Sequence, residues 1–275
     1  MIDIQTLVDH VRTYNPKCNE DLIRRAYEYG KEKHSKQRRQ SGELYFTHPI
    51  EVAIILAGQK LDDDTIITAL LHDTLEDTDA TFKELTELFG VEIAQLIDGV
   101  TKLTNLELSS VQAKQAENFR KLLLAMSQDL RVLLVKLGDR LHNMRTMDSM
   151  PKHKQLKIAS ETLYLYAPLA HRIGLYNIKT ELEDLSLKYT EPEVYRDIVL
   201  KLKNSQTEAL RYLKNFSDSI KKHLENDRLQ INIKERTKSI YSIRKKMLTQ
   251  GVSFDEVYDK FAIRIIIDSD KIYEK

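Results

Sequence analysis

The stretch that decides the fold is Ala69-Leu70-Leu71-His72-Asp73-Thr74-Leu75-Glu76-Asp77. The spacing predicts a helix in which His72 and Glu76 lie on one face, four residues apart, and in which Asp73 and Asp77 do the same. The leucines before the histidine indicate burial, and buried charge is costly unless it is paired or bound to a metal. The ordinary alternative, a solvated helix face, stays open at this point.

Two other segments carry residues of the same types, namely Thr47-His48-Pro49 and Lys136-Leu137-Gly138-Asp139-Arg140-Leu141-His142-Asn143. The candidate ligands are His48, His72, Asp73 and Asp139. Two imidazoles and two carboxylates suit Mn²⁺, Fe²⁺ or Zn²⁺, and the oxygen share without thiolate favours Mn²⁺ over a structural zinc. The remaining histidines are interpreted as structural or surface groups: His10, His34, His142, His153, His171 and His223.

The composition favours long helices. Only 8 Gly and 5 Pro occur in 275 residues, which leaves few of the turn residues that sandwiches and barrels need. The hydrophobic share of 41% beside 31% charged residues is typical of a globular protein with amphipathic elements. The formal net charge of +1 argues against a general nucleic-acid binder, so we expect no direct nucleic-acid partner.

Targeting and redox signals are few. Cys18 is the single cysteine, which excludes an intramolecular disulfide and a cysteine-based zinc site. The N-terminal residues do not resemble a secretory signal peptide, and the longest apolar runs are far shorter than a membrane span. We therefore expect a cytoplasmic protein without a membrane partner.

Helical spacing continues to about residue 226. Asn19 is a predicted N-cap, Thr81 and Glu84 predict a capping box, and Gly90 is expected to end that helix at Phe89. Another predicted helix carries an apolar stripe at spacings of three and four residues: Leu130, Leu133, Leu134, Leu137 and Leu141.

The pattern changes near residue 229. Leu229–Lys234 alternates apolar and polar residues and predicts a strand, a helical pattern follows, and Phe261–Ile267 predicts a second strand. Two strands and a helix cannot bury both faces of a sheet, so we expect the start of an incomplete α/β domain after a mainly α-helical chain. The second strand would be an exposed edge, so a homo-oligomer is possible.

These motifs resemble a known family. A histidine, a later His-Asp pair and a distant aspartate resemble the HD phosphohydrolase superfamily. The longer segments 39–49, 72–78 and 136–146 resemble the hydrolase half of the Rel/SpoT family, which makes and degrades the alarmone (p)ppGpp. Residues 166–174 resemble the segment that follows this half. The resemblance implies a helical HD domain and a role in the stringent response.

The resemblance also implies roles for individual residues. His48, His72, Asp73 and Asp139 match the family's Mn²⁺ ligands. Glu76 and Asp77 match the acidic pair that activates water. The positions that line the guanosine nucleotide pocket are matched by Arg39, Ser41, Tyr45, Asn143 and Thr146.

One departure lies in the nucleotide pocket. Gln40 stands where the family usually has lysine, and the lost cation is expected to weaken contact with the base or phosphate, with Lys36 or Arg38 as compensation. The basic run 31–39 is predicted to draw in the anionic ligand, and a solvated helix end is the ordinary alternative for it.

The C-terminal segment resembles the opening of the family's synthetase domain. Arg236 and Lys238 match ATP-phosphate contacts and Asp259 matches a Mg²⁺ ligand, whereas Glu235 replaces a glycine and puts a negative charge beside the triphosphate. The later acidic catalytic residue falls beyond Lys275, so we expect no alarmone synthesis from this chain.

The prediction is thus a metal-dependent guanosine-3′,5′-bis(diphosphate) 3′-pyrophosphohydrolase that releases pyrophosphate and GDP or GTP. The predicted parts are a hydrolase domain (1–150), a helical connector (151–227) and a fragment of a nucleotidyltransferase-like synthetase domain (228–275). Two alternatives are a non-catalytic alarmone-binding regulatory fragment and an HD enzyme that acts on other nucleotides. A helical scaffold without a site is disfavoured by the three separated motifs.

Overall fold

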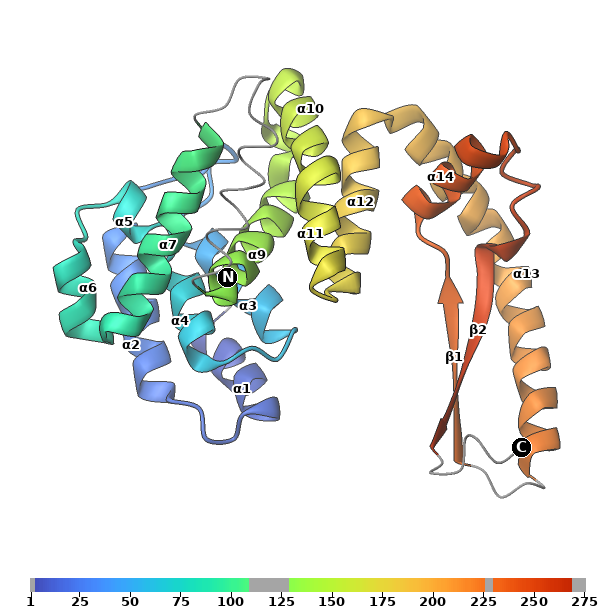
Figure 1. Cartoon of the computed structure of the whole chain (residues 1–275), viewed down its shortest axis with the longest axis horizontal. Coiled ribbons are helices and arrows are strands. Elements are labelled where there is room, and N and C mark those ends of the chain that lie inside the picture. The colour runs from blue at the N-terminus through green and yellow to red at the C-terminus, as the bar shows by residue number, and fades with distance from the viewer. Residues whose placement is uncertain (1–2, 109–128, 226–229, 269–275) are drawn as a thin grey trace. The chain divides into compact units, whose positions relative to one another are not determined.

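The computed structural model describes residues 3–108, 129–225 and 230–268 (Figure 1). The chain divides into two compact units, Met1–Lys179 and Thr180–Lys275, and each is described by itself. The predicted mainly α-helical class is confirmed, because helices make up most of both units (Figure 1).

The first unit is helical throughout its described part. Its α-helices are α1 (Ile4–Tyr14), α2 (Glu20–Lys33), α3 (Thr47–Ala57), α4 (Asp63–Leu71), α5 (Thr74–Asp77), α6 (Phe82–Phe89), α7 (Val91–Leu108), α9 (Leu130–Thr146), α10 (Lys152–Glu161) and α11 (Ala167–Arg172). A 3₁₀ turn (Met147–Ser149) follows α9, and a π-helical turn (Thr162–Tyr166) joins α10 to α11.

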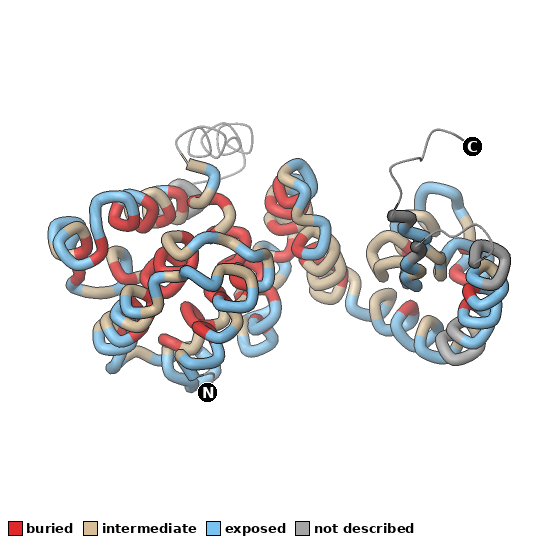
Figure 2. The backbone as a smooth tube through the Cα atoms, turned by 90° about the horizontal axis from the view of Figure 1, so that it is seen from below, coloured by how far each residue is buried: buried red, intermediate tan, exposed pale blue. Residues whose placement is uncertain are grey.

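Helices α3, α4 and α9 form the centre of this unit. They pack on one another, and α1, α2 and α7 cover them, which agrees with the concentration of buried backbone there in Figure 2. All residues of α4 from Thr65 to Leu71 are buried, so this part of the helix is enclosed on every side. The segments that carry the candidate ligands therefore begin or end inside the core.

A glycine lets α9 approach α3 closely. A Cβ atom at Gly138 would lie 3.1 Å from Cδ2 of Leu56 and 3.2 Å from Cγ1 of Val52, which is tighter than most side-chain contacts. The next residue along α9 is Asp139. The missing side chain thus places a candidate ligand against the helix that carries His48.

The predicted helix ends of the first unit are confirmed. Asn19 caps α2 by accepting a hydrogen bond from the amide of Leu22, and Thr81 and Glu84 form the reciprocal capping box of α6. Helix α6 ends at Phe89 because Gly90 has a φ of 92°, a value that suits glycine. The predicted helix with the leucine stripe is α9.

The second unit combines helices with a hairpin. It contains most of α12 (Tyr176–Thr190), then α13 (Pro192–Glu225), β1 (Gln230–Thr237), α14 (Ile240–Gln250), a 3₁₀ turn (Tyr258–Lys260) and β2 (Phe261–Asp268). The strands are antiparallel, and they lie beside α13 in Figure 1. A small apolar cluster of Ile198, Ile243, Phe254 and Val257 fixes α14 to α13.

Both predicted strands are present. Leu229, the first residue of the first predicted strand, lies outside the described residues. The predicted connector 151–227 contributes residues to both compact units, and the functional division into three parts stays a prediction.

Candidate metal centre

Three segments far apart in the sequence bring their side chains together in the first unit. His48 lies in the first turn of α3, His72 follows the last residue of α4, and Asp139 lies in α9. One ligand atom from each lies within 4.8 Å of the others, and all three residues are buried. Side chains of these types rarely share a buried position without a cation.

The prediction of one helix across residues 69–77 is wrong. Helix α4 ends at Leu71, and α5 begins at Thr74. The side chains explain the break: Nδ1 of His72 bonds the carbonyl of Ala69 at 2.8 Å, and the hydroxyl of Thr74 donates to the carbonyl of Leu71 at 2.6 Å. These bonds satisfy the last carbonyls of α4 in place of further helical turns.

The same bond determines which nitrogen of His72 can bind a cation. A carbonyl oxygen only accepts, so Nδ1 of His72 carries the hydrogen, and Nε2 of the neutral ring carries the lone pair. Within the described part of the chain, this buried Nε2 has no hydrogen-bond partner. Burial lowers the pKa of His72, but the Asp73 carboxylate outweighs burial and raises it to about 9. A positive charge, either a proton or a metal ion, is therefore favoured at this nitrogen.

Asp139 is held as a carboxylate. Nζ of Lys136 lies 2.9 Å from its Oδ2, and the amide of Asn143 donates to its Oδ1 at 2.5 Å. Burial alone would raise the pKa of Asp139, but the Lys136 ammonium and His48 keep it well below its ordinary value. Oδ1 lies 3.2 Å from Nε2 of His48.

Asp73 reaches the same centre from a less buried position. Its Oδ1 lies 3.1 Å from Nε2 of His72, and its Oδ2 lies 3.7 Å from Nε2 of His48. Burial would raise the pKa of Asp73, but the effect of His72 and His48 is larger than that of burial, and the pKa lies below its ordinary value. Asp73 therefore approaches two of the three clustered residues, His48 and His72.

The residues present fit a divalent cation. They offer two imidazole nitrogens and two carboxylates without a thiolate, a set of hard to borderline donors. Nε2 of His72 has no hydrogen-bond partner in the described chain, and it lies 3.1 Å from Oδ1 of Asp73, so a cation at this point would meet both atoms. The donor set supports a divalent metal and does not by itself select Mn²⁺.

The predicted acidic pair lies beside this centre. The hydroxyl of Tyr45 is 2.8 Å from Oδ2 of Asp73 and 2.8 Å from Oδ2 of Asp77, so one phenol joins a candidate ligand to a candidate catalytic residue. The Glu76 residue is exposed, but partial desolvation of its carboxyl group, together with the charges of Asp73 and Asp77, raises its pKa. A raised pKa makes Glu76 a better proton acceptor than an ordinary surface glutamate.

Arg39 links the predicted nucleotide residues on α9. Its guanidinium donates to Oδ1 of Asn143 at 3.0 Å and to Oγ1 of Thr146 at 3.2 Å, and it lies 3.1 Å from Nδ1 of His142. Tyr45 lies on the other side of the centre through its bonds to Asp73 and Asp77. Four of the six predicted substrate residues thus border the candidate metal site.

The other two predicted substrate residues lie apart from the centre. Gln40 and Ser41 are exposed in the turn that reverses the chain at Gly42, whose φ is 88°. The hydroxyl of Ser41 bonds Glu43 in the same turn at 3.2 Å. Within the described residues, neither side chain has a hydrogen bond or ion pair with the centre, so their role in substrate binding stays a prediction.

Most cations of the basic run 31–39 have partners away from the candidate centre. Lys33 pairs with Asp79 and Glu84, and Arg38 donates to the carbonyl of Gly42. Arg39 is the residue of this run whose contacts reach the candidate centre.

His142 is interpreted from the sequence as a structural or surface group, and the structure excludes the surface position. The residue is buried, and its Nδ1 lies 2.6 Å from Nδ1 of His48. Burial lowers the pKa of His142 to about 3, with His48 and Arg39 adding to the effect. Its spacing from Asp139, three residues along a helix, was the signal that could have assigned it to the site.

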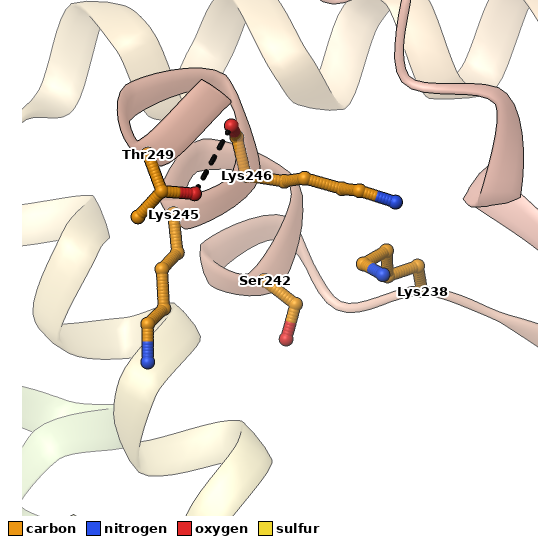
Figure 3. Close-up of a pocket in the computed structure, with 5 residues that line it drawn as sticks. All are labelled: Lys238, Ser242, Lys245, Lys246 and Thr249. Atoms are coloured by element: carbon orange, nitrogen blue, oxygen red, sulfur yellow. Dashed lines mark hydrogen bonds between the residues drawn. The ribbon is translucent and has the colours of Figure 1, made fainter. Parts of the chain in front are cut away.

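A pocket in the second unit is lined mainly by lysines. It has a volume of about 280 Å³ and is lined by Lys238, Ser242, Lys245, Lys246 and Thr249 (Figure 3). Lys238 and Lys246 each lie 2.8 Å from an oxygen of Asp259, and these contacts lower the pKa of Asp259 to about 2. The predicted ATP and Mg²⁺ residues Lys238 and Asp259 are therefore paired with each other.

None of the described helices combines the length and the apolar composition that crossing a bilayer requires.

The helical core and its buried histidine and aspartate donors define a class of helical metal-site domains. A model of the HD domain family matches residues 26–176, and the chain belongs to this family.

Curated relatives share most of this sequence. It is 51% identical over 259 residues to a GTP pyrophosphokinase of Myxococcus xanthus, covering 93% of this chain and 34% of the relative. It is 44% identical over 268 residues to a guanosine-3′,5′-bis(diphosphate) 3′-pyrophosphohydrolase of Aquifex aeolicus, covering 97% and 37%. It is 42% identical over 270 residues to the bifunctional (p)ppGpp synthase/hydrolase SpoT of Escherichia coli, covering 98% and 38%.

The chain thus spans between 34% and 38% of the length of these relatives. The resemblance to the Rel/SpoT family is confirmed at the level of sequence. A solved structure described as a metazoan ortholog of SpoT that hydrolyzes ppGpp covers 66% of this chain and 95% of its own at 23% identity. Its TM-score of 0.38 is too low to support an argument.

Proposed function

We propose that this chain hydrolyses the 3′-pyrophosphate of ppGpp and pppGpp with Mn²⁺, and so degrades the alarmone of the stringent response. The observation that carries the proposal is the buried donor set of His48, His72 and Asp139, with Asp73 beside it. The relatives that carry hydrolase names support the choice of substrate.

In this proposal the metal ion is held by His48, His72, Asp73 and Asp139. When bound, a divalent cation lowers the pKa of a coordinated water and neutralises charge on the phosphoryl group under attack. Lys136 and Asn143 hold the Asp139 carboxylate in place through their hydrogen bonds.

Glu76 is the proposed general base. Its raised pKa suits acceptance of a proton from the attacking water. The water oxygen forms a bond to the phosphorus on the ribose 3′ oxygen, and the bond between that phosphorus and the 3′ oxygen breaks. The 3′ oxygen takes up a proton, and the products are pyrophosphate and GDP or GTP. Asp77 and Tyr45 keep the neighbouring carboxylates oriented.

Substrate binding is assigned to the residues on the other side of the centre. Arg39, Asn143 and Thr146 form one hydrogen-bonded group that can meet the guanosine nucleotide. Gln40 and Ser41 lie in an exposed turn from which they would contact the ligand only at its edge.

Product analysis tests this function. Purified protein is incubated with ppGpp and Mn²⁺, with and without a chelator, and the products are separated by anion exchange. Pyrophosphate release that the chelator abolishes supports the proposal. Binding of ppGpp without turnover favours the non-catalytic regulatory fragment, and cleavage of nucleoside triphosphates instead favours another HD phosphohydrolase.

Location and assembly also stay proposals. A cytoplasmic location suits a nucleotide substrate, and fractionation of cells that produce the protein tests it. Self-association through strand β2 is tested by light scattering, where a strictly monomeric species at high concentration counts against it.

A further inference from the structure

A chain of three side chains links the predicted nucleotide pocket to the predicted metal site. Nη1 of Arg39 lies 3.1 Å from Nδ1 of His142, and the same Nδ1 lies 2.6 Å from Nδ1 of His48. His142 and His48 are both buried, and their ring centroids are 4.8 Å apart.

The arginine determines the state of His142. A guanidinium carries donors and no acceptor, and it stays protonated in proteins. Nδ1 of His142 must therefore offer its lone pair to Arg39, so the hydrogen of the neutral ring is on Nε2.

The state of His142 in turn determines the state of His48. Two nitrogens 2.6 Å apart cannot both present lone pairs, so one hydrogen lies between them. Because the single lone pair of His142 Nδ1 is shared by Arg39 and His48 as donors, the hydrogen between the rings is on Nδ1 of His48. Nε2 of neutral His48 then carries a lone pair that faces the carboxylate oxygen Oδ1 of Asp139 at 3.2 Å, an approach of two acceptors that a bound cation would relieve.

We propose that His142, held by Arg39, is a positioning residue that fixes His48 in the tautomer whose Nε2 binds the metal ion. Helix α9 supplies both Asp139 on the Nε2 side of His48 and His142 on its Nδ1 side. Partners of this kind orient imidazole ligands and typically change metal affinity about 10–100-fold when removed. The proposal rests on the proposed metal function.

His72 shows the same arrangement with a different partner. Its Nδ1 bonds the backbone carbonyl of Ala69, which no substitution can remove, whereas the partner of His48 is a side chain. A substitution at His142 therefore isolates the effect on one ligand.

The first measurement uses nitrogen NMR of the metal-free wild-type protein at pH 8, with the His48 signals assigned from a His48→Gln variant. We expect a neutral His48 ring with hydrogen on Nδ1. A His48 ring with hydrogen on Nε2, or on both nitrogens, overturns the proposal. This readout is independent of catalysis, so absence of ppGpp cleavage by the wild type would sink the proposed function and leave the tautomer assignment standing.

The second measurement compares Mn²⁺ affinity by calorimetry in three variants. His142→Leu removes the acceptor and should weaken Mn²⁺ binding about 10–100-fold. His142→Asn can place its side-chain carbonyl oxygen near the position of Nδ1, so that this oxygen replaces the imidazole as the acceptor. We expect its Mn²⁺ affinity to stay within about threefold of the wild type. His153→Leu changes an exposed histidine of the same unit and should bind as the wild type does.

Equal Mn²⁺ affinity of His142→Leu and the wild type, in a variant whose circular dichroism is unchanged, contradicts the proposal. Equal loss in His142→Leu and His142→Asn contradicts it as well, because a merely structural role would not be rescued by an acceptor. If His142→Leu does not fold, the proposal is tested by the tautomer of His48 in the wild type and by the Mn²⁺ affinity of His142→Asn.

Discussion

The two compact units each gather charged side chains, but the surroundings of these groups differ. In the first unit, Asp139 is buried with His48 and His72, and Nε2 of His72 has no hydrogen-bond partner in the described chain. In the second unit, the side chain of Asp259 is 50% exposed and already lies between two lysines. The comparison teaches that buried imidazole nitrogens and a carboxylate oxygen close to one another, rather than a concentration of charge at an exposed position, indicate a cation site.

The largest expected effect comes from removing the imidazole of His72. His72→Ala should abolish metal-dependent ppGpp cleavage, because it deletes a donor that faces the centre, while the helical fold is largely kept. Product analysis with Mn²⁺ measures the cleavage, and circular dichroism measures the fold. His153→Ala, at an exposed position, is the matched control, and wild-type turnover of His72→Ala would remove the metal site from the proposal.

A second, smaller effect separates metal binding from proton transfer. Glu76→Gln should retain Mn²⁺ but lower kcat about 10²–10⁴-fold, the usual contribution of a general base. The amide keeps the shape of the side chain and cannot accept the proton. Steady-state kinetics beside calorimetric Mn²⁺ binding measure both properties, and an unchanged kcat would exclude Glu76 from the mechanism.

A third effect concerns the packed core of the first unit, which surrounds the candidate metal centre. A Cβ atom at Gly30 would lie 2.5 Å from Cε2 of Phe46 and 3.0 Å from the carbonyl oxygen of Leu70, so Gly30→Ala should lower the free energy of unfolding. Overpacking of this kind costs about 1–3 kcal/mol, partly offset by the helix propensity of alanine.

Denaturant unfolding measures this change. Gly58→Ala is the control, because its Cβ would come no closer than 3.3 Å to the carbonyl oxygen of Ile55 and Gly58 has a helical φ of −62°. We expect its unfolding free energy to stay within about 0.5 kcal/mol of the wild type. Equal destabilisation by both substitutions would show that the close contacts of Gly30 are not the cause.

The smallest effect belongs to the second unit. Lys246→Met should raise the pKa of Asp259 from about 2 toward its ordinary value of 3.8, because one of two neighbouring cations is lost. In the wild type the lowered pKa of Asp259 stabilises the fold at pH values above 3.8, the ordinary pKa of an aspartate. This stabilisation is lost as the pH falls through about 2. NMR titration of the carboxyl carbon measures the shift, and an unchanged pKa would mean that Lys246 does not influence this group.

Local signals in the sequence predicted much of the fold. The N-cap at Asn19, the capping box at Thr81 and the stop at Gly90 depend on neighbouring residues, so they could be recognised without tertiary structure. The alternation that predicted β1 and the apolar run that predicted β2 are local signals too.

The contacts of the site depended on tertiary structure. The residues of the predicted metal set do meet, but the break after Leu71 arises from side-chain bonds to carbonyls that helical periodicity does not show. His142 was missed because its partners, Arg39 and His48, are 103 and 94 positions away along the chain. Gln40 and Ser41 are predicted pocket residues through the family resemblance alone, and local sequence does not show that a tight turn separates their side chains from the contacts of Arg39.

The short break between α4 and α5 also limits how this centre could be transplanted. Successive residues of an uninterrupted α-helix point about 100° apart, so adjacent side chains there diverge. His72 (φ −60°, ψ −29°) and Asp73 (φ −94°, ψ −4°) keep right-handed helical dihedrals, and their ligand atoms lie 3.1 Å apart. A protein engineer who copies the His-Asp pair onto a straight helix would not reproduce the helix end, where His72 and Thr74 bond the carbonyls of Ala69 and Leu71. The unit to graft is the helix end with its turn, including Thr74.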